Sequence, residues 1–235
     1  MKIVLLGYGK MGKLIEEKAI GRGHLIHRII DDATWTPNAI EGADVAIEFS
    51  NPESAKDNIL KSFEAKVPIV VGTTGWYNDL EEIKNKMNEK DGAILPATNF
   101  SLGVNIFFEV NRVLAKIMNK KEEYAVGVQE IHHTQKLDSP SGTAITTANI
   151  LLDEIDRYDN WQESDSDEEK SIAIEALRKP DVPGTHTVSY ESDVDQLAIK
   201  HTAKSRDGFA LGAVLAAEFL KGKTGYFTMK DLIKL

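Results

Sequence analysis

Two adjacent histidines and a nearby lysine are the residues of this sequence best suited to acid–base chemistry. Residues 130–144 read EIHHTQKLDSPSGTA, so Lys136 stands three residues after the pair His132 and His133. Histidine titrates near neutrality, with an ordinary pKa of about 6.5, and can therefore give and take protons at physiological pH. Lys136 adds a positive charge that can donate a proton or bind a carboxylate, and Asp138 can orient it. The segment predicts proton transfer to a small anion.

The residues that follow offer a place for a carboxylate group. A turn containing Ser141, Gly142 and Thr143 precedes an apolar pattern that predicts a helix over residues 143–155. Free backbone N–H groups and hydroxyls at a helix start bind anions. We expect this turn and Lys136 to hold a dicarboxylate while a histidine addresses the carbon skeleton between its two carboxylates.

Two other interpretations of the histidine segment are a surface loop with coincidental histidines and a metal site. Adjacent histidines usually point in different directions, the sequence offers no third ligand at a suitable spacing, and Lys136 would repel a cation. We therefore expect no metal. The stretch is polar and interrupted by proline, so we expect it to lie outside the core. We expect His186 and His201, in later strands, to be structural or peripheral.

A glycine-rich turn near the N-terminus predicts a dinucleotide site. The turn follows a strand-like run and opens a helical pattern, with the residues Gly7, Tyr8, Gly9, Lys10, Met11 and Gly12. Glycines at these positions allow a pyrophosphate to approach the helix N-terminus. Asp31, about 20 residues further on, is placed to accept hydrogen bonds from the adenosine ribose. Because Asp31 and Asp32 would repel a 2′-phosphate, we predict NADH as the preferred cofactor, with NADPH as the alternative. An ordinary glycine-rich turn remains the other interpretation.

Two further segments follow apolar strands, at positions where parallel sheets bind ligands. They contain Gly72, Thr73 and Thr74 in the first case and Ala97, Thr98, Asn99 and Phe100 in the second. Their small and hydroxyl side chains suit a nicotinamide and its ribose, although plain turns would have the same composition.

The order of predicted elements places these motifs in two domains. Up to residue 102, strands at 2–6, 25–30, 43–49, 67–71 and 93–96 alternate with helical segments, which predicts a Rossmann-like α/β domain with a parallel sheet. Beyond it, helices at 104–118, 143–155 and 209–220 and strands at 124–131, 182–190 and 196–201 predict a second α+β domain on a mixed sheet. The acidic run 162–170 predicts a solvated loop.

Composition excludes several classes of function. The 235 residues carry a net charge of −9, which argues against nucleic-acid binding. The absence of cysteine excludes disulfides and cysteine-bound metals. No apolar run approaches the roughly 20 residues of a membrane helix, and the first residues lack a signal-peptide layout, so we expect a cytoplasmic protein without a membrane partner.

The residues quoted above resemble the signature of the dihydrodipicolinate reductase family, E-x-H-H-x-x-K-x-D-x-P-S-G-T-A. The segments GYGKMG, GTTG, ATNFSLGVN, GTHTV and HTAKSRDGFALGA are similar as well, so the resemblance covers most of the chain in order. It implies NAD(P)H-dependent reduction of 4-hydroxy-tetrahydrodipicolinate (dihydrodipicolinate) to tetrahydrodipicolinate in diaminopimelate and lysine biosynthesis.

The resemblance also implies roles and an assembly. His132 corresponds to a catalytic acid/base and Lys136 to a proton donor, and the substrate-binding positions are His133, Gly142 and Thr143. Cofactor contacts fall on GYGKM, GTT and ATNF. A dinucleotide-binding domain would comprise residues 1–102 and 205–235, because the C-terminal helix returns to it. Residues 103–204 would bind substrate and form a homotetramer.

Two rival functions remain open at this point. An amino-acid dehydrogenase would share only the first half of the chain, whereas the histidine segment lies outside it. A catalytically silent dinucleotide sensor would keep the glycine turn but would have no need of a proton donor.

Overall fold

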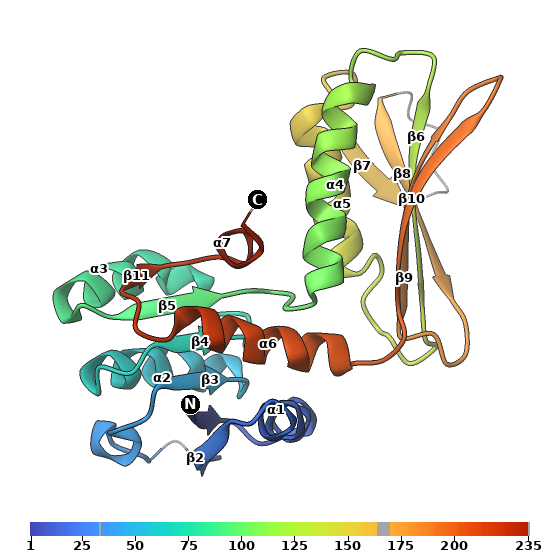
Figure 1. Ribbon diagram of the computed structural model, residues 1–235. Helices are drawn as coiled ribbons and strands as arrows, with labels where there is room; N and C mark the ends of the chain where they lie inside the picture. The colour runs from blue at the N-terminus through green and yellow to red at the C-terminus, as the bar shows by residue number, and fades with distance from the viewer. Residues whose placement is uncertain (33, 164–169, 235) are drawn as a thin grey trace. The chain divides into compact units, whose positions relative to one another are not determined.

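The computed structural model describes residues 1–32, 34–163 and 170–234. The chain divides into two compact units. Unit 1 contains Met1–Leu102 and Asp207–Leu235, and unit 2 contains Gly103–Arg206. The colours of Figure 1 show that the blue start and the red end of the chain both belong to unit 1.

In its described part, unit 1 is built on six parallel strands in the order β11-β5-β4-β3-β1-β2. The strands are β1 (Lys2–Leu6), β2 (Leu25–Ile30), β3 (Val45–Glu48), β4 (Ile69–Val71), β5 (Ala93–Pro96) and β11 (Gly225–Tyr226). The helices are α1 (Lys10–Gly21), α2 (Pro52–Glu64), α3 (Leu80–Lys90), α6 (Asp207–Leu220) and α7 (Met229–Ile233), with short 3-10 turns η1 (Pro37–Ile40) and η2 (Tyr77–Asp79).

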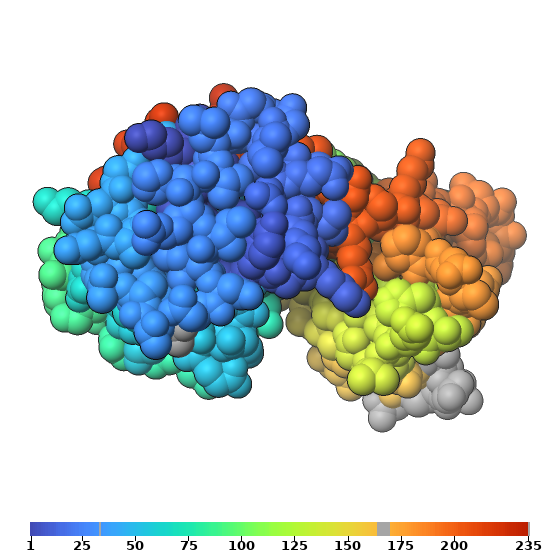
Figure 2. Space-filling view, turned by 90° about the horizontal axis from the view of Figure 1, so that it is seen from below, coloured from blue at the N-terminus to red at the C-terminus, as the bar shows by residue number. Residues whose placement is uncertain are grey.

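The central strands of unit 1 are apolar throughout because both faces of the sheet are covered. On β1, Ile3 and Leu5 pack with α1 and α6, whereas Val4 and Leu6 pack with α2 and α3. Figure 1 shows these helices on the two sides of the sheet. The blue surface in Figure 2 is the N-terminal part of the chain, which forms the outside of unit 1 at the β2 edge of the sheet.

Unit 2 is built on a mixed sheet whose described strands follow the order β10-β9-β6-β8-β7. The strands are β6 (Ala125–His132), β7 (Asn160–Glu163), β8 (Ser171–Arg178), β9 (Gly184–Glu191) and β10 (Gln196–Ala203). Strand β6 runs antiparallel to β9 and parallel to β8. The helices α4 (Leu102–Met118) and α5 (Gly142–Glu154) cover one face of this sheet (Figure 1) and enclose an apolar core with it.

The predicted fold class, a Rossmann-like parallel sheet followed by an α+β unit on a mixed sheet, is confirmed. The structure adds α3, α7, β7, β8 and β11, which the hydrophobic pattern does not predict. The predicted loop over 162–170 is wrong at its start, where Gln162 and Glu163 complete β7. Residues 164–169 of that loop lie outside the described residues. In the ranges that are described, no helix is long and apolar enough to cross a membrane.

Candidate active site

The register of the unit 2 sheet brings four polar side chains together at one end of its helix-covered face. Along β6 every second residue is buried, so Glu130 and His132 point to the same side. Glu130 lies opposite His186 of β9, and His132 lies opposite Arg178 of β8. We call Glu130, His132, Arg178 and His186 the β-sheet cluster.

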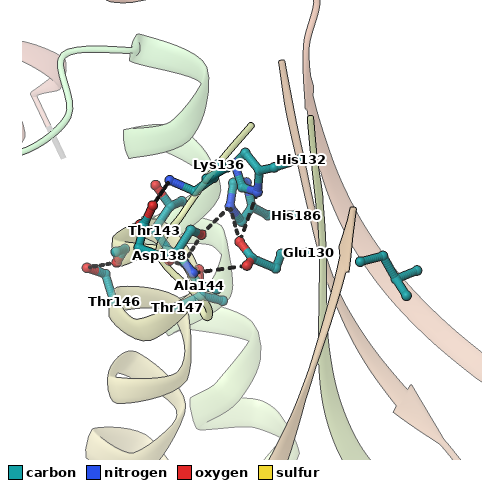
Figure 3. A network of polar contacts seen from close by, with 12 residues as sticks. Glu130, His132, Lys136, Asp138, Thr143, Ala144, Thr146, Thr147 and His186 are labelled. Atoms are coloured by element: carbon teal, nitrogen blue, oxygen red, sulfur yellow. Dashed lines mark hydrogen bonds and ion pairs between the residues drawn. The ribbon is translucent and has the colours of Figure 1, made fainter. Parts of the chain in front are cut away.

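Glu130 is the centre of this cluster and is completely buried. Its Oε1 accepts hydrogen bonds from the Ser141 backbone N–H at 2.9 Å and from Arg178 Nη1 at 3.3 Å. Its Oε2 lies 3.0 Å from His132 Nδ1 and 3.7 Å from His186 Nε2. Figure 3 shows both imidazoles turned toward the carboxylate. Burial alone would raise the pKa of the Glu130 carboxyl, but its contacts with His132 and Ser141 lower it to about 2. Glu130 is therefore charged at neutral pH.

The second imidazole, His186, is buried against the first. The two rings of His132 and His186 meet edge to face with centroids 5.0 Å apart. His186 Nε2 also lies 3.2 Å from the Ser141 hydroxyl. Burial lowers the pKa of His186 to about 4, so this ring is neutral at physiological pH.

The start of α5 completes one side of the cluster. Ser141 caps the helix by accepting a hydrogen bond from the Ala144 N–H at 3.2 Å. Gly142 and Thr143 form the first turn, and a β-carbon at Gly142 would meet nothing within 4 Å. The helix therefore presents an open N-terminal turn, with the positive end of its dipole beside the cluster, where a carboxylate can bind.

Lys136 lies on the loop between β6 and α5, close to the cluster (Figure 3). Its Nζ contacts Asp138 at 2.8 Å, and this contact lowers the pKa of the Asp138 carboxyl. Arg178 Nη2 donates to the Asp138 carbonyl at 2.7 Å and so ties the loop to the sheet. The Lys136 backbone N–H donates to the His133 carbonyl at 3.1 Å, and the His133 ring is half-buried. The loop thus brings a second cation to the histidines.

One expectation about this region is wrong. His132 does not lie outside the core: it is the last residue of β6 and only 8% exposed. His186, expected to be structural or peripheral, is buried and lies against both His132 and Glu130. Glu130 and Arg178 were missed as site residues. The alternation E-x-H on a predicted strand could have identified Glu130, because residues two apart on a strand share a face.

The cluster also supplies the third ligand that the sequence pattern lacks for a metal. Ligand atoms of Glu130, His132 and His186 lie within 4.8 Å of one another. However, the guanidinium of Arg178 already lies on the same carboxylate at 3.3 Å. A fixed positive charge at that distance opposes a divalent cation, so the arrangement suits a proton better than a metal.

The glycine turn of unit 1 has the close backbone contacts that its sequence predicts. Gly7 has a φ of 92°, and a β-carbon there would lie 2.3 Å from the Phe49 carbonyl oxygen. A β-carbon at Gly12 would lie 2.5 Å from the Gly7 oxygen, whereas one at Gly9 would meet nothing within 4 Å. Lys10 and Met11 follow Gly9 as the first residues of α1. The turn is tight at Gly7 and Gly12 and open at Gly9, the position that a pyrophosphate would approach.

The carboxylate of Asp31 is connected to this turn. Its Oδ1 accepts the Tyr8 backbone N–H at 2.9 Å. A cavity of about 360 Å³ lies beside it, lined among others by Gly9, Asp31, Asp32 and Ser50. Hydrogen bonds from Thr34 lower the pKa of the Asp32 carboxyl, so a negative charge faces this cavity.

The two further predicted cofactor segments lie at the carboxyl ends of β4 and β5, outside the lining of that cavity. The Thr73 hydroxyl accepts the Ser50 N–H at 2.9 Å, and a β-carbon at Gly72 would clash with the Phe49 ring at 2.2 Å. These residues hold neighbouring strand ends together. In the first segment Thr74 is exposed. In the second segment Phe100 is buried, whereas Ala97, Thr98 and Asn99 are partly or fully exposed.

Comparisons with known proteins identify one family along the chain. The model of the dihydrodipicolinate reductase N-terminus matches residues 1–100, and that of its C-terminus matches residues 103–233. The 4-hydroxy-tetrahydrodipicolinate reductase of Christiangramia forsetii is 52% identical over 99% of this chain and 98% of its own length. The protein of that name from Aquifex aeolicus is 39% identical over 82% of this chain and 74% of its own.

A solved structure has the same fold. The dipicolinate-bound dihydrodipicolinate reductase from Paenisporosarcina sp. TG-14 matches with a TM-score of 0.80 over 97% of both chains, at 18% identity. Both halves of the family pattern are therefore present in order, on the expected fold and with high identity to a curated relative. The chain belongs to the dihydrodipicolinate reductase family.

Proposed function

We propose that this protein reduces 4-hydroxy-tetrahydrodipicolinate (dihydrodipicolinate) to tetrahydrodipicolinate, a reaction of diaminopimelate and lysine biosynthesis. The observation that carries the proposal is the β-sheet cluster, which holds two histidines against a buried carboxylate beside the open first turn of α5. The relative that is 52% identical bears the name of this activity. A bound dihydronicotinamide would supply the hydride, and the chain would supply the proton and the binding site for a cyclic dicarboxylate.

In this proposal His132 is the catalytic acid/base and Lys136 the proton donor. Lys136 also balances one substrate carboxylate, which matters in a chain with a net charge of −9. The second carboxylate would bind the first turn of α5, at Ser141, Gly142 and Thr143, with His133 as a further contact. Support comes from the open space at Gly142 and from the Asp138 contact that keeps Lys136 beside the cluster.

We further propose that unit 1 binds the cofactor and that NADH is preferred. The pyrophosphate would lie at Gly9, with contacts from the remaining turn residues, and Asp31 would bind the ribose hydroxyls through its second oxygen. The GTT and ATNF segments would face the nicotinamide half. Asp32 would repel a 2′-phosphate, so the KM for NADPH should exceed that for NADH. The variant Asp32→Arg should lower the KM for NADPH. Equal KM values for the two cofactors in the wild type would overturn the preference.

We propose that the protein works in the cytoplasm as a homotetramer assembled through unit 2, the substrate-binding and oligomerisation domain. The face of the unit 2 sheet away from α4 and α5 carries a row of small residues in register, namely Ala198, Ser189, Gly127 and Ala173. Such a row allows another sheet to approach closely. Light scattering on the full chain should give four times the monomer mass of 26.0 kDa. A monomer would contradict this part of the proposal.

The activity itself can be tested with a coupled assay. The unstable substrate is made in situ by the preceding synthase from its own precursors, and consumption of NADH is followed by absorbance. Consumption that needs both the synthase and this protein supports the reductase. An amino-acid dehydrogenase would instead consume NADH with a keto acid and ammonium, and a silent sensor would bind NADH without turnover.

A further inference from the structure

The proposed mechanism gives no role to Glu130, although this carboxylate is completely buried and contacts His132. Burying a carboxylate strongly destabilises the folded protein unless its oxygens are well paired. Here Oε1 has two partners, the Ser141 N–H at 2.9 Å and the Arg178 guanidinium at 3.3 Å. Oε2 faces His132 Nδ1 at 3.0 Å. The two contacts at Oε1 fix the carboxylate, so that Oε2 is held against the His132 imidazole.

The direction of the proton in this contact follows from the charge of the carboxylate. The pKa of Glu130 is lowered to about 2, so at neutral pH both oxygens can only accept. Neither Oε2 nor His132 Nδ1 meets hydrogen-bond geometry with any described group. A bare Nδ1 lone pair 3.0 Å from this charged oxygen would be repelled, which places the ring proton on Nδ1. Nε2 is then the nitrogen left to exchange protons. Gly184 leaves room beside it, since a β-carbon at that position would lie 3.0 Å from Nε2.

We propose that Glu130 is a positioning residue, which holds the Nδ1–H of His132 and so dedicates Nε2 to proton transfer. This inference rests on the proposed function, because it assigns the partner of the proposed acid/base. A zinc ion on the same three side chains would need Nδ1 without its proton, and Arg178 opposes that ion.

The substitution Glu130→Gln tests this proposal directly. In Glu130→Gln the atom at the Oε1 position still faces two donors, from Ser141 and Arg178, so it must be the amide oxygen. The amide NH2 group then faces Nδ1 of His132. Two donors cannot face each other, so Nδ1 must become an acceptor and the proton must move to Nε2. The ring then cannot carry both protons without a clash of donors.

The experiment combines NMR with kinetics on the full chain. ¹⁵N-histidine spectra, assigned with a His132→Gln sample, report which ring nitrogen carries the proton and need no substrate. The wild type should show Nδ1–H, and Glu130→Gln should show Nε2–H. In the coupled assay Glu130→Gln should lower kcat by about 10²-fold or more, the range of a lost acid catalyst, with the KM for substrate within about twofold.

Two control variants separate positioning from folding. Glu130→Asp keeps the acceptor, so it should retain Nδ1–H and a kcat between those of the wild type and Glu130→Gln. Glu175→Gln makes the same chemical change on the neighbouring strand β8, where Glu175 is exposed and accepts from Gln129 at 2.6 Å. It should leave tautomer and kcat unchanged.

The outcomes are distinguishable. A wild-type ring that carries its proton on Nε2, or a Glu130→Gln protein with wild-type tautomer and kcat, would overturn the positioning role. A wild type that shows Nδ1–H but consumes no NADH in the coupled assay would instead overturn the proposed function. A folded Glu130→Gln protein with switched tautomer and lowered kcat supports both.

Discussion

Gly184 faces the ring of His132 so closely that a β-carbon at position 184 would lie 3.0 Å from Nε2 and 3.3 Å from Cδ2. Gly184 is the first residue of β9, two positions before His186 on the same face. The glycine thus gives His132 the room to keep its Nδ1 on Glu130, 3.0 Å away. A side chain at this position would displace the ring of His132, the proposed acid/base.

The variant Gly184→Ala is therefore expected to lose activity while keeping its fold. The methyl group must push the His132 ring aside, and a displacement near 1 Å can cost on the order of 10²-fold in rate. Steady-state kinetics should show a lower kcat, whereas NADH binding, which is proposed to occur on unit 1, should be unchanged. Wild-type kcat in a folded Gly184→Ala protein would show that the ring position is not critical.

Removal of either proposed proton-transfer side chain should reduce turnover. His132→Gln and Lys136→Ala are each expected to lower kcat by roughly 10²–10⁴-fold, because a positioned acid contributes about that factor. Lys136→Ala should also raise the KM for substrate, since the ammonium group is proposed to bind a carboxylate. The coupled assay measures both constants. Turnover near the wild-type level in both variants would remove these residues from the mechanism.

Substitutions at two glycines of the turn should distinguish an effect on cofactor affinity from an effect on stability. Gly12→Ala places a β-carbon 2.5 Å from the Gly7 oxygen, so it should lower the thermal midpoint and weaken NADH binding together. Gly9→Ala meets nothing within 4 Å, so its thermal midpoint should stay close to that of the wild type. Its affinity for NADH should nevertheless fall, because the methyl group occupies the proposed pyrophosphate position. Calorimetry with and without NADH checks both; unchanged NADH affinity in Gly9→Ala would place the cofactor elsewhere.

The buried His186 should make stability depend on pH in a defined window. Its pKa is about 4, against an ordinary 6.5, mainly because of burial. The electrostatic influence of His132, His201 and Lys136 also lowers this pKa, whereas that of Glu130 raises it. Between pH 6.5 and about 4 the unfolded chain binds the proton more readily, so the free energy of unfolding falls as the pH falls.

Urea unfolding at several pH values tests this window. The wild type should lose on the order of 3 kcal/mol across it from this group. His186→Gln removes the titrating ring, and its unfolding free energy should decline less over the same range. If both proteins show the same slope between pH 6.5 and pH 4, the buried ring does not stay neutral in the folded protein.

The strands of unit 1 are the part of the fold most readily predicted from the sequence. The runs at 2–6, 25–30 and 93–96 coincide with β1, β2 and β5, because apolar runs ending at glycine, aspartate or proline leave little choice. Helix α3 escapes such prediction: its buried residues are Ile83 and Met87, and apart from Leu80 at its start the rest is charged or polar. Strand β11 has two residues and forms by pairing with β5, a contact no local pattern encodes.

The candidate site was predictable as a segment and not as a cluster. The types and spacing of His132, Lys136 and Ser141 predict proton transfer and anion binding. His186 and Arg178 join them through the register of β9 and β8 on β6, which depends on tertiary pairing across 45 or more residues. Burial of His132 likewise depends on residues far along the chain, because His186 and Gly184 lie against its ring. The polarity of the segment therefore indicated its chemistry, but it wrongly predicted that His132 lies outside the core.

Transfer of deuterium from reduced cofactor to product is the most direct test of the central claim. NADH carrying deuterium at the transferable position is supplied with substrate made in situ, and the product is analysed by mass spectrometry. We predict tetrahydrodipicolinate with one deuterium, formed only when this protein is present and formed far more slowly with His132→Gln. NADH that remains unconsumed, or a product without deuterium, would contradict the assignment.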